Sequence, residues 1–393
     1  MPRIIGSPLR YIQGPGEMKN LYKHLKNWGN NFIVIIDKPI LSIVEKDVKT
    51  SFKACKGKAV YALFENECTM KQINALAKKA QSSKCDVLVS IGGGKCADAC
   101  KAAAFKAHTA CVIVSTAASC DAPCSHSAII YKENHEFDQY YYPIKSPDVV
   151  IVDSEIIARA PVRLLRCGLA DALSTYFEAR SCWRTGRDDV TEWKAAPSVT
   201  AYALAKLCYD TILKQGYKAC VACENKVVTQ ALEDVIEANT YLSTIGFESG
   251  GLGAAHSIQD ALGLIPEIHS MYHGEKVAFG TLVHLVLENA DVEELNKVLQ
   301  FLFSLNLPMC LEDLNVKYLS PQMLTKVAKK ATGEGVPMKN MPFKVTPEMV
   351  EAAIIVADKL GKYFKKHGKV PGGLNDLGND CRCDLKKDNK CGC

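Results

Sequence analysis

The chain has 393 residues, of which 48% are hydrophobic and 23% charged, so it is long enough for two domains with ordinary buried cores. Its formal net charge of +5 is small for this length and forms no basic stripe, which excludes nucleic acid as an expected partner. No apolar run reaches the roughly 18 residues of a membrane span, and the beginning of the chain lacks a signal-peptide core. We therefore expect a cytoplasmic protein with no membrane partner.

Short apolar runs up to about residue 155 predict strands that alternate with helical patterns. The predicted strands lie at 32–36, 59–64, 87–91, 111–115, 127–131 and 149–152. The helical patterns among them include 17–26, 69–81 and 95–107. Such alternation is typical of a doubly wound, Rossmann-like parallel sheet. We expect this α/β domain to occupy residues 1–160.

Beyond about residue 160 the strand pattern fades and long amphipathic stretches predict an all-α domain over 161–367. Its predicted helices include 169–183, 198–213, 229–242, 277–288 and 347–364. No low-complexity linker separates the two halves, so we expect them to pack directly, with the ligand site in the cleft between them. Cysteines within the predicted elements, such as Cys85, Cys96, Cys100, Cys111 and Cys208, are interpreted as small buried hydrophobic residues.

The polar segment 368–393 contains two C-x-C pairs, formed by Cys381 with Cys383 and by Cys391 with Cys393. Such pairs could bind a soft metal ion. The spacing is not C-x-x-C, however, and nothing apolar lies nearby to pack around a site. We therefore favour the alternative of a disordered tail.

Three glycines separate a predicted strand from a predicted helix in the stretch "SIGGGKCADACKAAAF", residues 90–105. Glycine lets the backbone approach a ligand closely, and the free N–H groups at the start of a helix favour an anion such as a phosphate. A simple tight turn is the alternative, because the stretch does not contain the G-x-G-x-x-G pattern.

Asp37 ends the apolar run "NFIVIID". A carboxylate at the carboxyl end of an early strand can accept hydrogen bonds from the ribose hydroxyls of NAD and would repel the 2′-phosphate of NADP. Alternatively, Asp37 forms a turn with the following Lys38 and Pro39. The loop after the predicted strand 111–115 is rich in small and polar residues that suit a dinucleotide site: Thr116, Ser119, Asp121, Ser125 and Ser127.

Asp171, His256 and His273 could together hold a metal ion. The two histidines are separated by the rest of one helix, a turn marked by Pro266 and the start of another helix, so their imidazoles can converge. Asp171 lies among apolar residues near a predicted helix start, where an unpaired carboxylate is costly to bury. Taken singly, Asp171 could be an N-cap, His256 a hydrogen-bonded core histidine and His273 a surface residue.

Several long blocks resemble, in the same order, the metal-dependent (iron-containing) alcohol dehydrogenase family. They include "RIIGSPLRYIQGPG", "IGGGKCADACKAAA", "PVRLLRCGLADALSTYFEAR", "VIEANTYLSTIGFESGGLGAAHSIQ" and "YHGEKVAFGTL", and the resemblance ends near residue 365. It implies that Asp171, His256 and His273 are metal ligands and that Asp121 binds the substrate beside them. It further implies a set of NAD contacts, to which we add Gly93 from the glycine loop: Asp37, Gly94, Lys95, Asp98, Thr116, Ser119, Ser125, Ser127 and Tyr131.

Two departures from the family pattern indicate the branch. Members with a fourth protein ligand carry a histidine four residues after the aspartate, where this chain has Thr175, and Gln259 stands where some relatives have a further histidine. Three ligands with an open fourth position suit the Zn²⁺-dependent branch that oxidises glycerol, and the same donor set also suits Fe²⁺.

The resemblance therefore implies reversible, NAD-dependent oxidation of the small polyol glycerol to dihydroxyacetone. The hydride would pass to NAD from the secondary alcohol held at the metal, with Asp121, Asp171, His256 and His273 as the catalytic residues. The resemblance also implies a homo-oligomer, an octamer in relatives.

Three other functions are weighed against this one. A related 1,2-diol dehydrogenase would use the same site. A dehydroquinate-synthase-like lyase would need a basic cluster for its acidic substrate, and the blocks around Asp171 and His273 show none. A non-enzymatic NAD-binding protein with a structural zinc is disfavoured because the ligand set is not closed.

Overall fold

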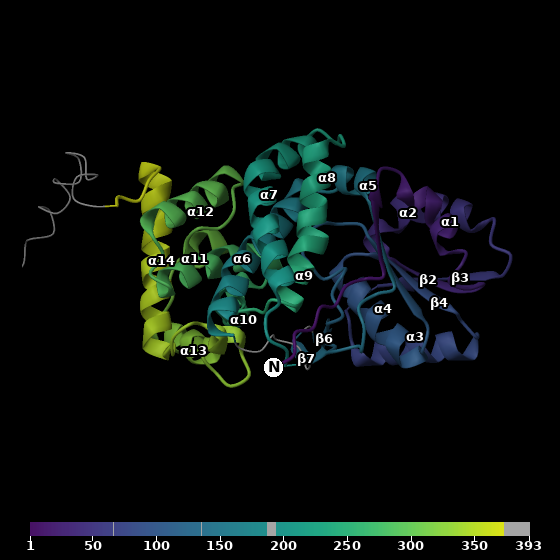
Figure 1. The fold of residues 1–393 in the computed structure, drawn as a ribbon, viewed down its shortest axis with the longest axis horizontal. Coiled ribbons are helices and arrows are strands. Elements are labelled where there is room, and N and C mark those ends of the chain that lie inside the picture. Colours follow the sequence, from purple (N-terminus) through teal and green to yellow (C-terminus); the bar gives the residue numbers. More distant parts are fainter. Residues whose placement is uncertain (66, 135, 187–193, 373–393) are drawn as a thin grey trace, which may run out of the picture.

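The computed structural model describes residues 1–65, 67–134, 136–186 and 194–372. The strands and their helices lie at one end of the molecule and the later helices at the other (Figure 1). The predictions for Cys381, Cys383, Cys391 and Cys393 fall outside the described residues. None of the described helices combines the length and the apolar character that crossing a membrane requires.

Six strands form one parallel sheet in the order β1-β8-β5-β4-β2-β3, which confirms the predicted sheet. They are β1 (Arg10–Gly14), β2 (Asn31–Asp37), β3 (Lys58–Phe64), β4 (Val87–Gly92), β5 (Ala110–Ser115) and β8 (Val149–Asp153). The prediction did not include β1. Its sequence, RYIQG, has no apolar run, because this strand lies at the edge of the sheet and is only partly buried.

The strand predicted at 127–131 was wrongly assigned to the parallel sheet. β6 (Ala128–Tyr131) instead pairs antiparallel with β7 (Phe137–Tyr141) in a separate two-stranded hairpin. A short apolar run does not distinguish a central parallel strand from one strand of a hairpin. β6 alternates buried with half-buried residues and β7 is largely exposed, as expected for a hairpin with one solvated face.

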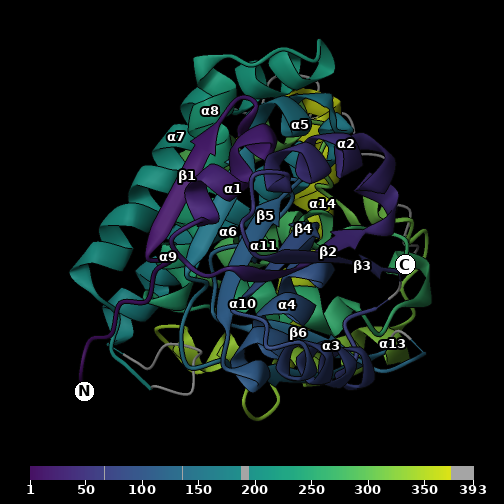
Figure 2. The same cartoon turned by 90° about the vertical axis from the view of Figure 1, so that its right-hand side faces the viewer.

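Alternate residues of the central strands face opposite sides of the sheet, and helices cover both sides (Figures 1 and 2). Ile33 and Ile35 of β2 belong to a buried cluster that includes α3 and α4, whereas Phe32 and Val34 belong to a second cluster with α1 and α2. The helices of this part are α1 (Leu21–Leu25), α2 (Leu41–Phe52), α3 (Met70–Ser82), α4 (Gly94–Ala107) and α5 (Ser154–Arg159). This period of two confirms the doubly wound arrangement.

The chain connections change direction between β2 and β4. From β2 the chain passes to β3 at one edge of the sheet, returns to β4 on the other side of β2, and continues outward to β5 and β8. Open α/β sheets bind ligands outside the carboxyl ends of the strands at such a switch point. Here those ends are Asp37 and Gly92.

After Asp153 the described chain contains only helices, turns and loops. The main helices are α6 (Val162–Thr185), α7 (Val199–Glu224), α8 (Gln230–Glu237), α9 (Ser243–Glu248), α10 (Ala254–Leu262), α11 (His273–Leu287), α12 (Val292–Ser304), α13 (Pro321–Ala331) and α14 (Pro347–His367). Short 3₁₀ turns lie at Glu17–Asn20, Lys38–Ile40, Pro266–Ile268, Leu311–Leu314 and Pro337–Asn340, and a π-helical turn, Ala238–Leu242, joins α8 to α9.

The predicted helical half is confirmed, but its helices are longer and more numerous than predicted. α6 begins at Val162 rather than 169, α7 extends to Glu224 rather than 213, and α12 and α13 were not predicted. The division into two domains at residue 160 stays a prediction. The cysteines Cys96, Cys100, Cys111 and Cys208 are buried as predicted, whereas Cys85 is only partly buried.

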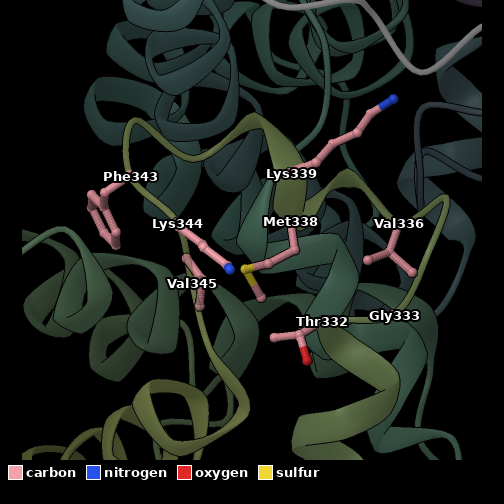
Figure 3. A pocket seen from close by; sticks show the side chains of 8 residues that line it. All are labelled: Thr332, Gly333, Val336, Met338, Lys339, Phe343, Lys344 and Val345. Carbon is pink, nitrogen blue, oxygen red and sulfur yellow. The ribbon is translucent and has the colours of Figure 1, made fainter.

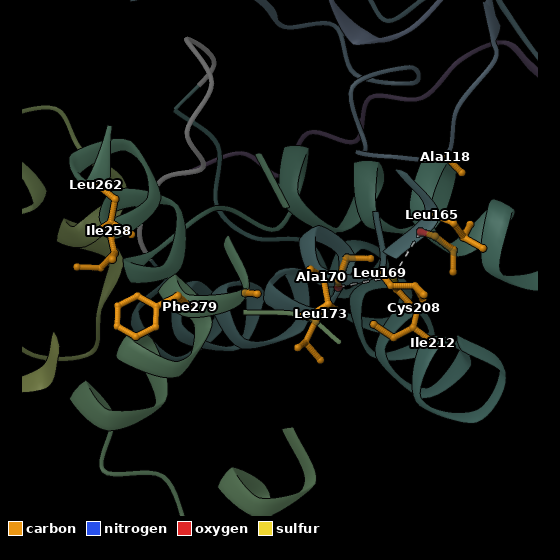
Figure 4. Close-up of a cluster of buried hydrophobic side chains, with 14 of the residues drawn as sticks. Ala118, Leu165, Leu169, Ala170, Leu173, Cys208, Ile212, Ile258, Leu262 and Phe279 are labelled. Atoms are coloured by element: carbon orange, nitrogen blue, oxygen red, sulfur yellow. Dashed lines mark hydrogen bonds between the residues drawn. The ribbon is translucent and has the colours of Figure 1, made fainter. Parts of the chain in front are cut away.

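α6 packs against α7, α9, α10 and α11. Its Leu165, Leu169 and Leu173 lie in the buried cluster of Figure 4, with Ile212 of α7 and Phe279 of α11. A spacing of four residues places the three leucines along one stripe of the helix. This packing fixes α6 in the helical half and thereby positions the polar side chains that α6 also carries.

Candidate functional site

Three helices bring Asp171, His256 and His273 to one point, and we call these residues the Asp–His–His cluster. Asp171 lies on α6, His256 on α10, and His273 is the first residue of α11. Oδ1 of Asp171 is 3.2 Å from Nε2 of His273 and 3.5 Å from Nε2 of His256. One possible ligand atom from each residue lies within 4.8 Å of the other two. Three donors at such separations can contact one common ion.

Asp171 is buried without ordinary partners. It lies more than two turns inside α6, so the alternative that it caps the helix N-terminus is wrong. The residue is 1% exposed, and within the described chain neither carboxylate oxygen has a partner with hydrogen-bond geometry. Burial acts to raise the pKa of Asp171, but the two imidazoles outweigh burial and hold the pKa well below its usual range. An ionised, buried carboxylate between imidazoles fits a divalent cation.

Close backbone packing fixes the position of His273. A Cβ atom on Gly274 would lie 2.0 Å from the carbonyl oxygen of Cys167 on α6, so only glycine allows this approach. Arg163, also on α6, donates two hydrogen bonds of 2.6 and 2.8 Å to the carboxylate of Glu275. These contacts hold the first turn of α11 against α6 and so place His273 opposite Asp171.

Sequence reasoning missed Glu178, which contacts His256 through the other ring nitrogen. Glu178 lies seven residues after Asp171 on the same face of α6 and is fully buried. Its Oε2 is 2.6 Å from Nδ1 of His256. Burial acts to lower the pKa of His256, but Glu178 and Asp171 outweigh it and raise that pKa well above its usual value. The seven-residue spacing from Asp171 is the signal that could have found Glu178.

Asp121 reaches the same region from the loop after β5. Ser243 donates a hydrogen bond of 2.8 Å to Oδ2 of Asp121, and the hydroxyl of Thr244 donates to its backbone carbonyl. Burial, reinforced by the negative charge of Asp171, raises the pKa of Asp121 to about 8. The loop after β5 and helix α9 thus place the carboxyl group of Asp121, with its raised pKa, beside the Asp–His–His cluster.

The π-helical turn Ala238–Leu242 sets the register of the groups that hold the Asp121 loop. Asn239, within this turn, donates hydrogen bonds to the carbonyl of Ala118 at 3.0 Å and to that of Leu165 at 3.4 Å. A π turn adds a residue per turn relative to an α-helix. Asn239, Ser243 and Thr244 can therefore all contact the loop that carries Asp121. The sequence pattern predicted neither this turn nor its contacts.

The glycine loop lies beside Asp37 at the switch point of the sheet. A Cβ on Gly92 would lie 2.6 Å from Cβ of Asp37, so internal packing requires glycine there. A Cβ on Gly93 would meet no atom of the described chain within 4 Å. The N-cap residue of α4 is Gly93, which has no side chain with which to cap the helix. Open space in front of a helix N-terminus with a glycine N-cap fits the phosphates of a dinucleotide.

The carboxylate of Asp37 is half-buried at the end of β2. Burial raises its pKa, although hydrogen bonds from the backbone N–H groups of Gly93 and Lys38, and the charge of Lys95, act in the opposite direction. Lys95 itself forms an ion pair of 2.6 Å with Glu67. The Lys95 ammonium also lies 5.3 Å from the ring centroid of Tyr131. Lys95 and Tyr131 are both predicted NAD contacts, and the structure places them side by side.

Asp98 is buried beneath the loop between β5 and β6. Its Oδ1 is 2.7 Å from Nζ of Lys101, and its Oδ2 accepts a hydrogen bond of 3.0 Å from the backbone N–H of Ile129. Lys101 also donates to the carbonyls of Ala122 and Ser127. In this structure Asp98 therefore holds the loop against α4, and Lys101 is a second residue that sequence reasoning missed.

The remaining predicted dinucleotide residues lie along this loop. Thr116 is buried, and its backbone N–H donates to the carbonyl of Gly92 at 3.1 Å, which ties the loop to the glycine turn. The hydroxyls of Ser125 and Ser127 are 2.6 Å apart, and Ser119 is partly buried. The structure thus brings the loop and the glycine turn together at one edge of the sheet.

Thr175, which stands where the resemblance implies a fourth ligand in some family members, has hydrogen-bonding contacts here. The hydroxyl of Thr175 lies 2.8 Å from that of Ser243, which in turn donates to Asp121. Gln259 is buried on α10. Among the described histidines, cysteines and carboxylates, only Asp171, His256 and His273 form a group with metal-ligand spacing.

A pocket of about 330 Å³ lies elsewhere in the helical half, between the end of α13 and the loop that leads to α14 (Figure 3). Its lining includes Thr332, Met338, Phe343 and Lys344. None of the predicted site residues lines it, and the structure therefore separates this pocket from the Asp–His–His cluster.

The fold and the site together fit an enzyme that binds a dinucleotide and a divalent metal ion. Residues 8–154 match the family model described as iron-containing alcohol dehydrogenase. A glycerol dehydrogenase of Escherichia coli O6:H1 is 46% identical over 364 residues, which cover 93% of this chain and 99% of that protein. The chain belongs to the iron-containing alcohol dehydrogenase family.

Solved structures agree with this membership over nearly the whole chain. The crystal structure of glycerol dehydrogenase from Schizosaccharomyces pombe has a TM-score of 0.88 and 31% identity, with 94% of each chain covered. That of a probable glycerol dehydrogenase from Sinorhizobium meliloti 1021 has a TM-score of 0.86 and 36% identity, and covers 92% of this chain and all of that one.

Proposed function

We propose that the protein oxidises glycerol reversibly to dihydroxyacetone, with NAD as the hydride acceptor. The observation that carries this proposal is the convergence of Asp171, His256 and His273 next to Asp121. The similarity to glycerol dehydrogenases over 93% of the chain supports the choice of substrate. A related 1,2-diol would fit the same chemistry and is an outcome that the experiment below distinguishes.

Asp171, His256 and His273 hold the divalent metal ion in this proposal. A catalytic zinc lowers the pKa of bound water from about 15.7 to about 7, and this Lewis-acid effect is the chemistry that the ion supplies to an alcohol. We propose Zn²⁺ because Thr175 leaves three protein ligands, as in catalytic zinc sites, with Fe²⁺ as the alternative that the same donor set also suits. The observation that fits such an ion is the buried carboxylate of Asp171, neither oxygen of which has a partner with hydrogen-bond geometry in the described chain.

Asp121 holds a hydroxyl group of the polyol. Its carboxyl group is oriented by Ser243, and its neighbour Asp171 belongs to the Asp–His–His cluster. A substrate hydroxyl that donates to this carboxyl group would be kept at a defined place relative to the cluster, and such positioning lowers the entropic part of the barrier. The burial of Asp121 also excludes water from around it.

The glycine turn and the loop after β5 bind NAD, which supplies the acceptor for the hydride. Asp37 accepts hydrogen bonds from the adenosine ribose, and the backbone at Gly93 and Gly94 faces the diphosphate. The open space at Gly93 is the observation that fits this group. The other NAD contacts that we propose are Lys95, Asp98, Thr116, Ser119, Ser125, Ser127 and Tyr131.

A homo-oligomeric assembly and a cytoplasmic location are further parts of the proposal. The assembly rests on the resemblance to the family, which implies an octamer, and the location rests on the expectation drawn from the sequence. Light scattering of the purified protein would measure the assembly directly. A monomer at all concentrations would contradict the homo-oligomeric assembly and leave the rest of the proposal unaffected.

The proposed reaction is tested by NADH formation with glycerol, 1,2-propanediol and a phosphorylated polyol. We expect the highest kcat/KM with glycerol, loss of turnover after chelation, and its return on addition of Zn²⁺. Preference for 1,2-propanediol would assign the related diol activity. Full activity in the chelated protein would refute the metal-dependent mechanism, and turnover of only the phosphorylated polyol would refute the substrate class.

Asp37→Ser is expected to raise the ratio of kcat/KM for NADP to that for NAD by about tenfold or more. The reason is that a carboxylate beside the adenosine ribose repels the 2′-phosphate of NADP. A tenfold change in this ratio corresponds to about 1.4 kcal/mol. Asp138→Ser changes an exposed aspartate of β7 and serves as the control. An unchanged cofactor preference in Asp37→Ser would show that this carboxylate does not face the ribose.

A further inference from the structure

Glu178 connects α6 to the start of α10 through both of its carboxylate oxygens. Oε1 accepts hydrogen bonds from the backbone N–H groups of Gly253 at 2.9 Å and His256 at 3.0 Å. Gly253 is the N-cap position of α10 and provides no side-chain cap, so Glu178 caps this helix from a neighbouring one. The other oxygen, Oε2, lies 2.6 Å from Nδ1 of His256.

The contact at Nδ1 selects one tautomer of His256. A carboxylate oxygen accepts hydrogen bonds, so Nδ1 of the ring carries the proton and donates it to Oε2. In the neutral ring, Nε2 then keeps its lone pair, and Nε2 is the atom that lies 3.5 Å from Asp171 Oδ1. The lone pair is thus presented to the Asp–His–His cluster, as a metal ligand requires.

We propose that Glu178 is a positioning residue that fixes the tautomer and ring orientation of His256 and thereby sets the affinity of the Asp–His–His cluster for its divalent cation. This inference rests on the proposed function, because it needs His256 to be a metal ligand. It assigns a role to a residue that contacts neither the substrate nor the cation.

The two oxygens of Glu178 have separate tasks, so one substitution can separate them. In Glu178→Gln the amide oxygen can keep the two backbone hydrogen bonds that cap α10. The amide NH₂ group would then face Nδ1 of His256 and force this atom to accept a hydrogen bond, which moves the proton to Nε2. The same logic makes an asparagine harmful in place of the aspartate of a serine-protease triad, because it selects the wrong tautomer.

The chain contains a matched control at a histidine outside the cluster. Glu248 is buried, its Oε1 lies 2.8 Å from Nδ1 of His126, and its Oε2 accepts the backbone N–H of His126 at 2.9 Å. Glu248→Gln therefore changes the same kind of carboxylate–imidazole contact without touching the cluster. Glu178→Asp is the conservative variant, because it keeps a charged acceptor on a shorter side chain.

The experiment measures Zn²⁺ affinity of the full-length protein by competition with a chromophoric chelator, together with thermal unfolding of the metal-free form. We expect Glu178→Gln to bind Zn²⁺ about 10- to 100-fold more weakly, Glu178→Asp to recover part of this loss, and Glu248→Gln to stay within about twofold of the wild type. In the metal-free proteins, with the ring of His256 in its neutral form, the ¹⁵N chemical shifts are expected to report a change of tautomer in Glu178→Gln.

Wild-type Zn²⁺ affinity in Glu178→Gln would overturn the inference, and so would an equal loss in Glu248→Gln. If Glu178→Gln fails to fold, the ¹⁵N spectrum of the neutral His256 ring in the metal-free wild type decides, and a proton on Nε2 rather than on Nδ1 overturns the inference. His256→Ala separates this failure from that of the proposed function. If His256→Ala loses Zn²⁺ and Glu178→Gln does not, only the role of Glu178 is wrong; if neither loses it, the metal site itself is wrong.

Discussion

Replacing His256 by alanine is expected to lower kcat/KM for glycerol by about 10³-fold or more, while the Kd for NAD changes by less than about twofold. The reason is that the cluster keeps only Asp171 and His273, and two donors leave the cation weakly held. A loss of 10³-fold corresponds to about 4 kcal/mol of transition-state stabilisation, which is within what a catalytic metal ion supplies. Steady-state kinetics and titration of NADH fluorescence measure the two quantities separately.

His269→Ala is the control for this substitution. His269 lies in the same segment between α10 and α11, and its Nε2 contacts the carbonyl of Gly263 at 3.0 Å rather than the cluster. Its removal should leave kcat/KM within about twofold. The chelated wild-type protein should be as inactive as His256→Ala. Turnover of His256→Ala at the wild-type rate would remove this residue from the site, and equal losses in both variants would indicate a general effect on folding.

The central part of the fold can be predicted from the sequence because β2 and β4 are buried on both sides. Strands of this kind read as continuous apolar runs, as in NFIVIID and VLVSIG. The edge strand β1 has no such pattern, since solvent reaches it. The hairpin strand β6 does have an apolar pattern, but its partner β7 follows it in the chain, and only the observed pairing shows that the two leave the parallel sheet.

The Asp–His–His cluster could be predicted because its residues are unusual in their surroundings. Asp171 is a carboxylate in an apolar helix, and His256 follows a glycine-rich turn. Glu178 is marked only by its seven-residue spacing from Asp171, and Ser243 carries no mark, because each acquires its role from a contact with a residue 78 or 122 positions away. Lys101 looks like a surface residue of an alanine-rich helix, yet the loop between β5 and β6 covers it. Patterns along the chain do not contain these long-range contacts.

Helix α6 has two roles, because one set of its residues builds the core and another set faces the site. In α6, leucines at four-residue spacing build the core, whereas Asp171, Thr175 and Glu178 lie toward the site and contact α9, α10 and α11. Because the core fixes the position of α6, it also fixes the positions of the carboxylates on this helix. We expect substitutions of the α6 leucines to weaken metal binding as well as folding, since both depend on the position of this helix.

Gly93→Asp is expected to raise the Kd for NAD by about 100-fold or more while the melting temperature of the cofactor-free protein changes by less than about 3 °C. A Cβ at this position meets no atom of the described chain within 4 Å, and the backbone angles, φ −87° and ψ −171°, are those of an N-cap residue in extended conformation. Aspartate is among the preferred N-cap residues, so it should cap α4, whose present N-cap residue is a glycine without a side chain. The same carboxylate would occupy the space of the NAD diphosphate and repel its charge, and 100-fold corresponds to about 2.7 kcal/mol.

Two further variants show why stability and cofactor binding should separate at this turn. Gly93→Ser also supplies a cap but no charge, so its effect on NAD binding should be smaller than that of Gly93→Asp. Gly92→Ala should instead destabilise the protein by about 1–3 kcal/mol, because its Cβ would lie 2.6 Å from Cβ of Asp37 and 3.0 Å from Cβ of Cys96. Calorimetric titration with NAD and thermal unfolding measure both quantities. Tight NAD binding by a folded Gly93→Asp protein would show that the diphosphate lies elsewhere, since the carboxylate and the phosphates cannot share this space.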